Sequence, residues 1–333
     1  MKVDVIGNKK VTKKYGKKFT NIQARFPTSC ELCNETGIRV GDIARMKIND
    51  NSFESKVSDY ITVPYRLVFS DKEIEQIKNG ESRFKDADIE IVDIIKNNPS
   101  VRLSDSLIAV LAHAYSDGSI SPTTFHYTNT DRELIDQYKS LIKDCFPNDK
   151  FREWKDGKII HIQMEAMGPV SVITRFIDKF GRKSITNPYV PTFIKNNNNF
   201  SGTWLRHTFA DEGWVNTNGK IVSLIRCVRF KNEELIKNLN WIEMESGIKK
   251  SRLISYLDDE QLKLIPRNNL IDDEAEMLKN LGVPCKVYLR KRVELIKNSI
   301  SATYELNCKG KDFIKVGFCC MSKQKQLKKL VNN

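Results

Sequence analysis

The sequence predicts an α+β protein with a separate N-terminal domain, residues 1–100, and two pseudo-symmetric halves, residues 101–198 and 199–333, each with the element order αββαββα. Three observations lead to this prediction. An apolar stretch that ends in an acid and a glycine occurs twice, about 95 residues apart, which indicates an internal repeat. Each copy is followed by a segment rich in β-forming residues and then by a helical pattern. The dipeptide Pro99-Ser100 separates these copies from a first segment that lacks the pattern.

The first half opens with a helix, because Ser104 or Asp105 provides an N-cap for the run LIAVLAHAY. This run is apolar on almost every side, so we expect the helix to be buried all round. The segment SISPTTFHYTN then favours β-structure, and DRELIDQYKSLIKDCF has its apolar residues on one helical face. A hairpin, FREWKDGKIIHIQME, turns at Asp156-Gly157, and PVSVITRFIDKFG closes the half as a helix.

In the second half, GTWLRHTFADEG repeats the buried helix, VNTNGKIVSLIRCVRF predicts a hairpin that turns at Asn218-Gly219, and KNEELIKNLNWIEMESGI predicts a helix. VPCKVYLRKR and ATYELNCKGKDF follow as candidate strands, and SKQKQLKKLVNN follows as a basic final helix. This half is about 35 residues longer than the first, and we place the excess near residues 249–267. NNLIDDEAEMLKNLGV resembles a second copy of the helix after the hairpin, so the alignment of the two halves is open there.

The charge of the chain points to a polyanionic partner. Lys and Arg number 55 against 42 Asp and Glu, which gives a formal net charge of +13. Residues 286–333 hold twelve basic residues against three acidic ones. Such a surface releases counterions when it neutralises phosphates. Apolar runs stay well short of the roughly 18 residues of a membrane span, and residues 1–8 lack a signal-peptide core, so we expect an intracellular protein, cytoplasmic or organellar, without a membrane partner.

Eight cysteines without a secretion signal argue against a disulfide framework. Cys30 and Cys33 form a CxxC pair in PTSCELCNETGIRVGD that resembles a zinc knuckle. A structural Zn²⁺ site needs four ligands, and the neighbouring sequence offers no second pair, while Cys308, Cys319 and Cys320 lie far along the chain. The pair is therefore either part of a zinc site or two ordinary reduced cysteines.

The two apolar stretches carry a family motif. VLAHAYSDG, residues 110–118, and LRHTFADEG, residues 205–213, resemble the nine-residue motif of the LAGLIDADG homing endonucleases. FHYTNTDRELIDQYKSLIKDCF resembles the family's segment after the first motif, and YELNCKGKDFIKVGFCCMSKQKQLKKLV resembles its closing segment. The resemblance spans about residues 104–330. It implies a monomeric DNA endonuclease in which the two motif helices pack against each other.

By this resemblance, Asp117 and Glu212 are the acids that hold a catalytic metal ion, and the carbonyl groups of Ser116 and Asp211 are further ligands. Mg²⁺ held by carboxylates provides a nucleophilic water and neutralises charge on the reacting phosphate, and Mn²⁺ is an expected substitute. A carboxylate at a helix C-terminus faces the negative end of the helix dipole, and this cost occurs twice, which favours a functional role over that of ordinary helix-end acids. Candidate catalytic lysines, each of which is otherwise a phosphate contact, are Lys183, Lys231 and Lys323.

Two motif positions depart from the family pattern. The third position is usually a small residue that allows close helix contact; it is Ala112 in the first copy but His207 in the second. The fourth position of the first copy is His113. We expect both histidines to be interface residues rather than catalysts, and His207 either to hold the helices apart or to form a hydrogen bond across them.

Strands expose alternate residues on one face, and Arg, Asn and Gln on such a face read base edges in DNA. In the first half the candidate base contacts are either Thr123, Phe125, Tyr127 and Asn129, or the hairpin pair His161 and Gln163. In the second half they are Asn216, Asn218, Lys220, Arg226 and Arg229. A slip of one residue would exchange the two faces of a strand. Candidate phosphate contacts are Lys155, Lys158, Arg290, Lys291 and Arg292.

We therefore expect a site-specific endonuclease that binds a long, nearly non-palindromic site in double-stranded DNA and cuts both strands with Mg²⁺. Two alternatives use the same scaffold: an RNA maturase that binds intron RNA, and a DNA-binding regulator that has lost cleavage. The retained acids Asp117 and Glu212 favour the nuclease. The start at Met1 and the ending Val-Asn-Asn favour a free-standing enzyme of an intron or mobile element over an intein.

Overall fold

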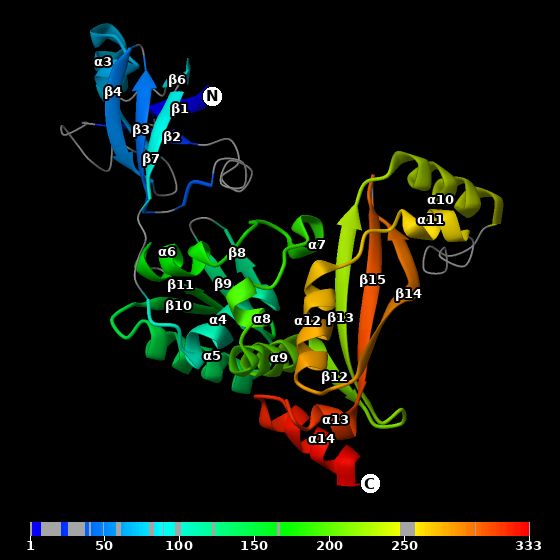
Figure 1. Ribbon diagram of the computed structural model, residues 1–333. Helices are drawn as coiled ribbons and strands as arrows, with labels where there is room; N and C mark the ends of the chain where they lie inside the picture. The colour runs from blue at the N-terminus through cyan, green and yellow to red at the C-terminus, as the bar shows by residue number, and fades with distance from the viewer. Residues whose placement is uncertain are drawn as a thin grey trace. The chain divides into compact units, whose positions relative to one another are not determined.

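The computed structural model describes residues 2–7, 21–25, 37–39, 41–48, 50–57, 61–79, 83–88, 90–96, 101–121, 124–164, 167–246, 257–296 and 298–332. The chain divides into two compact units. One comprises Met1–Val101, Ile120–Phe125 and Met164–Phe180, and the other comprises Arg102–Ser119, His126–Gln163 and Gly181–Asn333. Both combine helices with antiparallel sheets, so the α+β class is confirmed (Figure 1). Among the helices of the described ranges, none is long and apolar enough to cross a membrane.

The first unit contains two small sheets with the orders β5-β2-β1-β6 and β4-β3-β7. Their strands are β1 Lys2–Gly7, β2 Asn21–Arg25, β3 Ile43–Ile48, β4 Asn51–Lys56, β5 Ile61–Pro64, β6 Arg83–Asp88 and β7 Glu90–Ile95, and the helical segments are η1 Tyr65–Leu67, α3 Asp71–Lys78 and α6 Met167–Arg175. Alternation along β3 places Ala44, Met46 and Ile48 in the core of this unit. The buried Asp42 is ion-paired with Arg175 of α6 at 2.6 Å.

The second unit holds the two motif helices, α4 Asp105–Tyr115 and α9 Asn198–Glu212, which pack against each other. The chain around α4 forms β8 Gly118–Ile120, β9 Phe125–Asn129, α5 Arg132–Cys145, β10 Phe151–Asp156, β11 Ile159–Met164, α7 Lys183–Thr186 and α8 Thr192–Lys195. After α9 come β12 Gly213–Asn216, β13 Ile221–Phe230, α10 Glu233–Ser246, α11 Asp259–Lys263, α12 Asn269–Asn280, β14 Cys285–Leu295, β15 Ile300–Lys309, α13 Gly310–Phe313 and α14 Met321–Asn332. The sheets have the orders β10-β11-β9-β8 and β12-β13-β15-β14.

The motif helices begin at side-chain caps. Ser104 Oγ accepts a hydrogen bond from the backbone N–H of Leu107 at the start of α4, and Asn197 Oδ1 accepts from two backbone N–H groups at the start of α9. Every residue of α4 from Leu107 to Tyr115 is buried, as its apolar composition predicts.

Each motif helix also packs against a later helix. α5 packs against α4, while α12 packs against α9 and against the strand β14 (Figure 1). This pairing favours α12, rather than α10, as the counterpart of α5. The additional chain after α9 then falls at about residues 231–268 instead of the predicted 249–267. Both α10 and α12 have helical patterns, so periodicity alone left the alignment open.

Candidate functional site

The candidate site lies where α4 and α9 end. Gly118 and Gly213 follow the two motif acids and begin β8 and β12. A Cβ atom on Gly118 would lie 2.7 Å from the carbonyl oxygen of Ala114, and one on Gly213 would lie 2.7 Å from that of Phe209. Because only glycine fits this close approach, the motif glycines let each strand pass the last turn of its helix.

Arg226 of β13 joins the two helix ends. Its Nη1 donates to Glu212 Oε1 at 3.0 Å and to the carbonyl oxygen of Tyr115, the last residue of α4, at 3.3 Å. Its Nε and Nη2 donate to the two carboxylate oxygens of Glu274 on α12, at 3.3 and 2.8 Å. Arg226 is 6% exposed and Glu274 is fully buried. The guanidinium therefore balances two carboxylates inside the protein.

Asp117 has a neutral partner instead. Its Oδ2 accepts a hydrogen bond from Asn129 Nδ2 at 2.9 Å. Burial raises the pKa of Asp117 to about 7, and the negative charges of Asp211 and Glu212 act in the same direction. The positive charges of Lys183 and Arg226 oppose this rise only in part, so a further cation among the three carboxylates would be stabilised.

Lys183, at the start of α7, covers the carbonyl end of α4. Its Nζ donates to the carbonyl oxygens of Gly118 at 2.9 Å and Ala114 at 3.3 Å, and also to that of Ser116. A positive charge is favourable at this negative end of a helix. Burial lowers the pKa of Lys183 to about 8, because the ammonium group is removed from water.

Lys323 of α14 holds the corresponding position at α9. Its Nζ donates to the carbonyl oxygen of Gly213 at 2.7 Å and to that of Asp211 at 3.5 Å, and it also bonds that of Ala210. The structure therefore brings two of the three predicted lysines to the motif acids. Lys231 is not among them, because it lies seven residues (224 to 231), or roughly 23 Å of extended strand, beyond Leu224, the residue paired with Gly213.

A chain of buried polar groups crosses the interface between α4 and α9. His207 Nδ1 is hydrogen-bonded to His113 Nε2 at 3.0 Å, and His113 Nδ1 is hydrogen-bonded to Asp211 Oδ2 at 2.8 Å. Tyr127 donates to Asp211 Oδ1 at 2.8 Å, and Asn129 donates to the Tyr127 hydroxyl at 3.1 Å. Burial lowers the pKa of His207 to about 2, so this histidine is neutral. The two histidines thus bond to each other across the helices.

The residues that could hold a metal ion carry oxygen donors. Across the described ranges, no three His, Cys, Asp or Glu side chains converge as ligands. Asp117 and Glu212 offer carboxylate oxygens, and Ser116 and Asp211 offer carbonyl oxygens that accept from the two lysines. The two carboxylate oxygens of Asp211 are hydrogen-bonded to His113 and Tyr127. Mg²⁺ binds through one or two carboxylates and completes its shell with water and phosphate, so this donor set fits it.

Several predicted DNA contacts of the first sheet lie on the opposite face. Phe125 and Tyr127 are fully buried, so the prediction that they contact DNA is wrong. The two faces of β9 are exchanged relative to the prediction, which corresponds to an error of one residue. Asn129 is directed to Asp117. The outer face of this sheet instead carries His126 and Thr128, which pair with Gln163 and His161 of β11. Of the two alternative sets, the hairpin pair is thus the one on the outer face.

The same correction applies in part to the second sheet. Arg226 of β13 lies opposite Tyr304 of β15, and both side chains are on the buried face of the sheet. The prediction that Arg226 contacts bases is therefore wrong. Arg229, three residues later, lies on the outer face opposite Ser301. Arg290 donates to Glu305 Oε2 at 2.7 Å.

The remaining predicted contacts are distributed as follows. Exposed side chains at strand ends, turns and edges are those of Lys155, Lys158, Asn216, Asn218 and Lys220. Thr123, the pair Cys30 and Cys33, and the side chains of Lys291 and Arg292 lie outside the described residues.

Glu274 was not predicted as part of the site, and Tyr127 and Asn129 were predicted as base contacts instead of partners of the motif acids. Tyr127 and Asn129 are two residues apart on one strand and so share a face, which is a signal that they act together. Glu274 lies four residues after Leu270 and four before Leu278 on α12, so it is an acid on an apolar helical face. A buried acid requires a buried cation as its partner. Glu274 on this apolar face is therefore a sequence signal that a basic residue, here Arg226, is buried as well.

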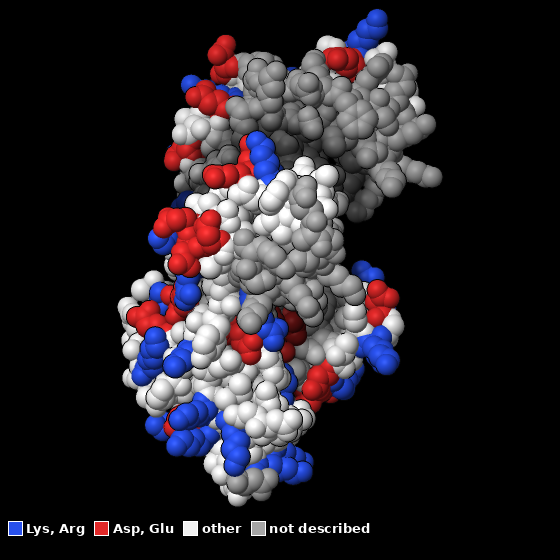
Figure 2. Space-filling model, turned by 90° about the vertical axis from the view of Figure 1, so that its right-hand side faces the viewer, with Lys and Arg blue, Asp and Glu red and all other residues white. Residues whose placement is uncertain are grey.

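A second group of basic side chains lies at some distance from the motif acids. Figure 2 shows Lys and Arg concentrated at the lower end of the face, at the height where Figure 1 draws α13 and α14. On α14, Lys325, Lys328 and Lys329 are exposed, whereas Leu327 and Leu330 are buried. The final helix is therefore anchored by its apolar side and presents positive charge on the other.

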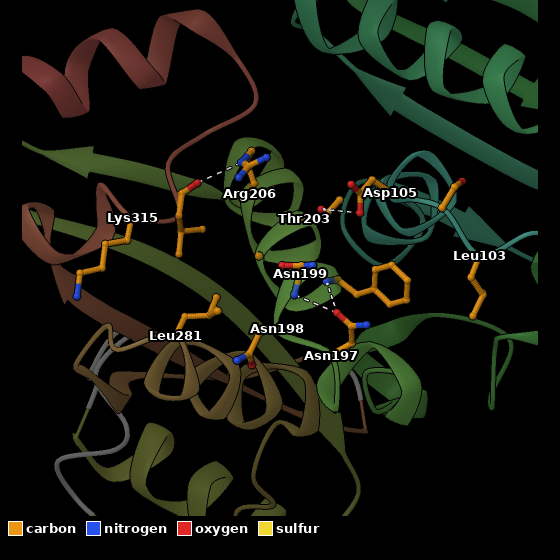
Figure 3. A pocket seen from close by; sticks show the side chains of 13 residues that line it. Leu103, Asp105, Asn197, Asn198, Asn199, Thr203, Arg206, Leu281 and Lys315 are labelled. Atoms are coloured by element: carbon orange, nitrogen blue, oxygen red, sulfur yellow. Dashed lines mark hydrogen bonds between the residues drawn. The ribbon is translucent and has the colours of Figure 1, made fainter.

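A cavity of about 610 Å³ lies at the other end of the motif helices, beside their first turns (Figure 3). Thr203 Oγ1 donates to Asp105 Oδ1 at 3.4 Å at its wall, and Arg206 Nε donates to the carbonyl oxygen of Val316 at 3.1 Å. The lining of this cavity reaches along α9 as far as Arg206, six residues before Glu212, and does not include the motif acids.

No protein-family model and no curated protein matches the sequence. Among solved structures, the chain is similar to I-DmoI in complex with DNA and Ca, with 11% identity, coverage of 69% of this chain and 98% of that chain, and a TM-score of 0.39. It is similar to I-DmoI in complex with DNA and Mn, with 14% identity, 64% and 94% coverage, and a TM-score of 0.36. It is also similar to full-length WhiA from Thermotoga maritima, with 12% identity, 71% and 62% coverage, and a TM-score of 0.37. I-DmoI is described as a homing endonuclease, and the N-terminal LAGLIDADG domain of WhiA is also among the similar structures.

Proposed function

We propose that the protein is a monomeric DNA endonuclease of the LAGLIDADG type, which cuts both strands of a long, nearly non-palindromic site with Mg²⁺. The observation that carries the proposal is the position of Asp117 and Glu212 at the joined ends of α4 and α9, within one electrostatic cluster. Each acid also has a lysine over the adjoining carbonyl groups, Lys183 at one end and Lys323 at the other. Both lysines neutralise the carbonyl end of a motif helix and so place a positive charge beside each acid.

The side chains of this cluster have separate tasks in the proposed reaction. Mg²⁺ bound to the acids would supply a nucleophilic water and neutralise charge on the reacting phosphate. Asp117 and Glu212 would hold it by their carboxylates, and Asn129 orients Asp117 through its hydrogen bond to Oδ2. Lys183 and Lys323 keep positive charge where the transition state gains negative charge.

The outer faces of the two sheets would contact the DNA. On the first sheet, the rings of His126, Trp154 and His161 lie parallel to within 6°, with centroids 4.9–5.2 Å apart. On the second, Arg229 and Arg290 add donors and positive charge. These side chains supply base and phosphate contacts, while the exposed lysines of α14 would neutralise further phosphates.

A DNA-binding regulator without cleavage is the second candidate. The observation that favours it is the bond from Arg226 to Glu212, since a guanidinium already neutralises one of the two acids. Such a protein would bind the same kind of DNA and leave it intact.

A cleavage assay separates the two candidates. Supercoiled plasmid that carries the DNA flanking the gene is incubated with the protein and Mg²⁺, and the matched control is the double variant Asp117→Asn/Glu212→Gln. A nuclease linearises or nicks the plasmid only with Mg²⁺, and the double variant leaves the plasmid intact. Salt-sensitive binding of the same DNA by wild type and double variant alike, without any cutting, identifies the regulator instead.

A further inference from the structure

The two motif acids receive different partners from the strands that face them. Asp117 accepts a hydrogen bond from the neutral amide of Asn129 on β9, at 2.9 Å. Glu212 accepts one from the guanidinium of Arg226 on β13, at 3.0 Å. β9 and β13 are each the second strand after a motif helix. The acids are therefore equivalent in position but differ in charge balance.

Arg226 is held in place by groups other than Glu212. Both oxygens of Glu274 accept hydrogen bonds from it, and so does the carbonyl oxygen of Tyr115. Arg226 is 6% exposed, and Glu274 is fully buried. Because a buried charge without a partner is costly, the guanidinium cannot leave Glu274 without a large loss of stability. Arg226 is thus a permanent cation beside Glu212.

We propose that Arg226 is a built-in cation that makes the two metal half-sites unequal, so that the Asp117 half binds a divalent ion first and the Glu212 half binds a second ion only in competition with the guanidinium. This inference rests on the proposed nuclease function. Arg226 occupies Oε1 of Glu212 and already supplies positive charge there, so a divalent ion gains less attraction. The hydrogen-bond partner of Asp117 is the uncharged amide of Asn129, and Lys183 and Arg226 act on this carboxylate only through space, so more of its attraction for an ion remains.

Unequal half-sites have a consequence for the order of cleavage. The strand served by the Asp117 half would be cut ahead of the other, and a nicked duplex would accumulate before the double-strand break. Arg226 acts through Glu212 and is therefore a positioning residue rather than a catalytic one.

The direct test counts bound Mn²⁺ ions in the absence of DNA, from the electron paramagnetic resonance signal of the free ion during titration of the full chain. Wild type should bind one ion tightly and a second at least about tenfold more weakly. The variant Arg226→Gln/Glu274→Gln removes both charges of the buried pair together, which leaves no unpaired charge, and should bind two ions with similar affinity. On strand-labelled target DNA, the same variant should lose the lag between the first and the second cut.

The matched control neutralises another partly buried ion pair of α12. Lys195 lies 2.7 Å from Asp273 Oδ1, and the side chain of Asp273 is 8% exposed. The variant Lys195→Gln/Asp273→Asn should fold, as judged by circular dichroism, and should keep one tight and one weak ion. A second readout leaves Arg226 unchanged: Asp117→Asn should abolish the tight ion, whereas Glu212→Gln should keep it.

Three results would overturn the inference and leave the nuclease proposal standing. They are two equally tight ions in wild type, a tight ion that disappears with Glu212→Gln instead of Asp117→Asn, and a folded Arg226→Gln/Glu274→Gln variant that still binds only one ion tightly. Failure of the nuclease proposal looks different, because wild type would then bind no Mn²⁺ and would not cut DNA under any metal condition.

Discussion

Tyr127 donates its hydroxyl hydrogen to Asp211 Oδ1 at 2.8 Å, and this bond ties strand β9 to the end of helix α9. The other carboxylate oxygen of Asp211 is hydrogen-bonded to His113 of α4. The side chains of both Asp211 and His113 are fully buried. The two motif helices are therefore held by a polar network as well as by apolar packing, and such a network stabilises the fold only while each member keeps its partner.

Removal of the Tyr127 hydroxyl tests this network. Tyr127→Phe should lower the free energy of unfolding by about 1–3 kcal/mol, because Asp211 Oδ1 is then left without its donor inside the protein. Urea unfolding of the full chain measures the change. The control is Tyr304→Phe, whose hydroxyl donates to the neutral carbonyl oxygen of Pro266 at 2.9 Å, and it should cost about 1 kcal/mol. Equal destabilisation in the two variants would mean that the charge of Asp211 adds nothing.

The helix ends at the site were predictable from the sequence because their signals are local. An apolar run that stops at an acid and a glycine marks where α4 and α9 end, and Gly118 and Gly213 are required there by close backbone approach. Lys183 and Lys323 were placed by the family resemblance, and the structure puts their ammonium groups on the adjoining carbonyl oxygens.

The partners of the acids were not predictable in the same way. The face of β9 depends on a register that shifts by one residue without any change in composition, so Tyr127 was placed on the DNA side although it is buried. Arg226 and Glu274 are 48 residues apart and meet only because α12 packs beside β13. Long-range pairs of this kind follow from tertiary packing, which periodicity does not describe.

The pH dependence of stability should report the buried charge of Asp117. Its pKa in the folded state is raised to about 7 from the ordinary value of 3.8. The folded protein therefore binds this proton more tightly than the unfolded chain, and the resulting contribution to the free energy of unfolding is fully present below about pH 4 and is lost as the pH rises through 7. Asp117→Asn removes the charge and keeps an acceptor for Asn129. At pH 8 this variant should be more stable than wild type, by at most about 4 kcal/mol, and the difference should vanish near pH 4.

Urea unfolding at several pH values measures this difference. Mg²⁺ should narrow it, because the ion stabilises only the folded protein that can bind it. Asp136 is the control: its carboxylate is exposed on α5 and ion-paired with Arg132, so Asp136→Asn should bring no gain at pH 8. A flat difference between Asp117→Asn and wild type from pH 4 to 8 would contradict the raised pKa.

The exposed lysines of α14 should contribute to the salt dependence of DNA binding. In the variant Lys325→Gln/Lys328→Gln/Lys329→Gln the buried Leu327 and Leu330 are kept, so the helix should stay in place. For every lysine that bonds a phosphate in the wild-type complex, the slope of log K against log salt concentration should fall by about 0.9, or at most by about 3 in total. Fluorescence anisotropy with a labelled duplex at several salt concentrations measures the slope.

The control for this prediction has three exposed lysines replaced elsewhere in the second unit, namely Lys237, Lys263 and Lys279. It has the same net charge as the α14 variant, so a general effect of charge would appear in both. A slope that falls equally in the two variants would show that α14 makes no specific contact with DNA.

The two acids should have separable effects on cleavage. Asp117→Asn and Glu212→Gln each keep the size of the side chain and remove one charge from the proposed metal site, so the fold and DNA affinity should be nearly unchanged. The rate of cleavage should fall by at least about a hundredfold, because each variant binds more weakly the metal ion that would generate the nucleophile and stabilise the leaving oxygen. On a duplex labelled separately on each strand, loss of both cuts in either variant means that the acids share a metal ion, whereas a nick in one strand means that they act independently. The different partners of the two acids, Asn129 at Asp117 and Arg226 at Glu212, favour independent action, with Glu212→Gln still able to nick one strand. Full Mg²⁺-dependent cutting by the variant that lacks both acids would place the reaction elsewhere in the chain, and the ends of α4 and α9 would then serve only to hold the two helices together.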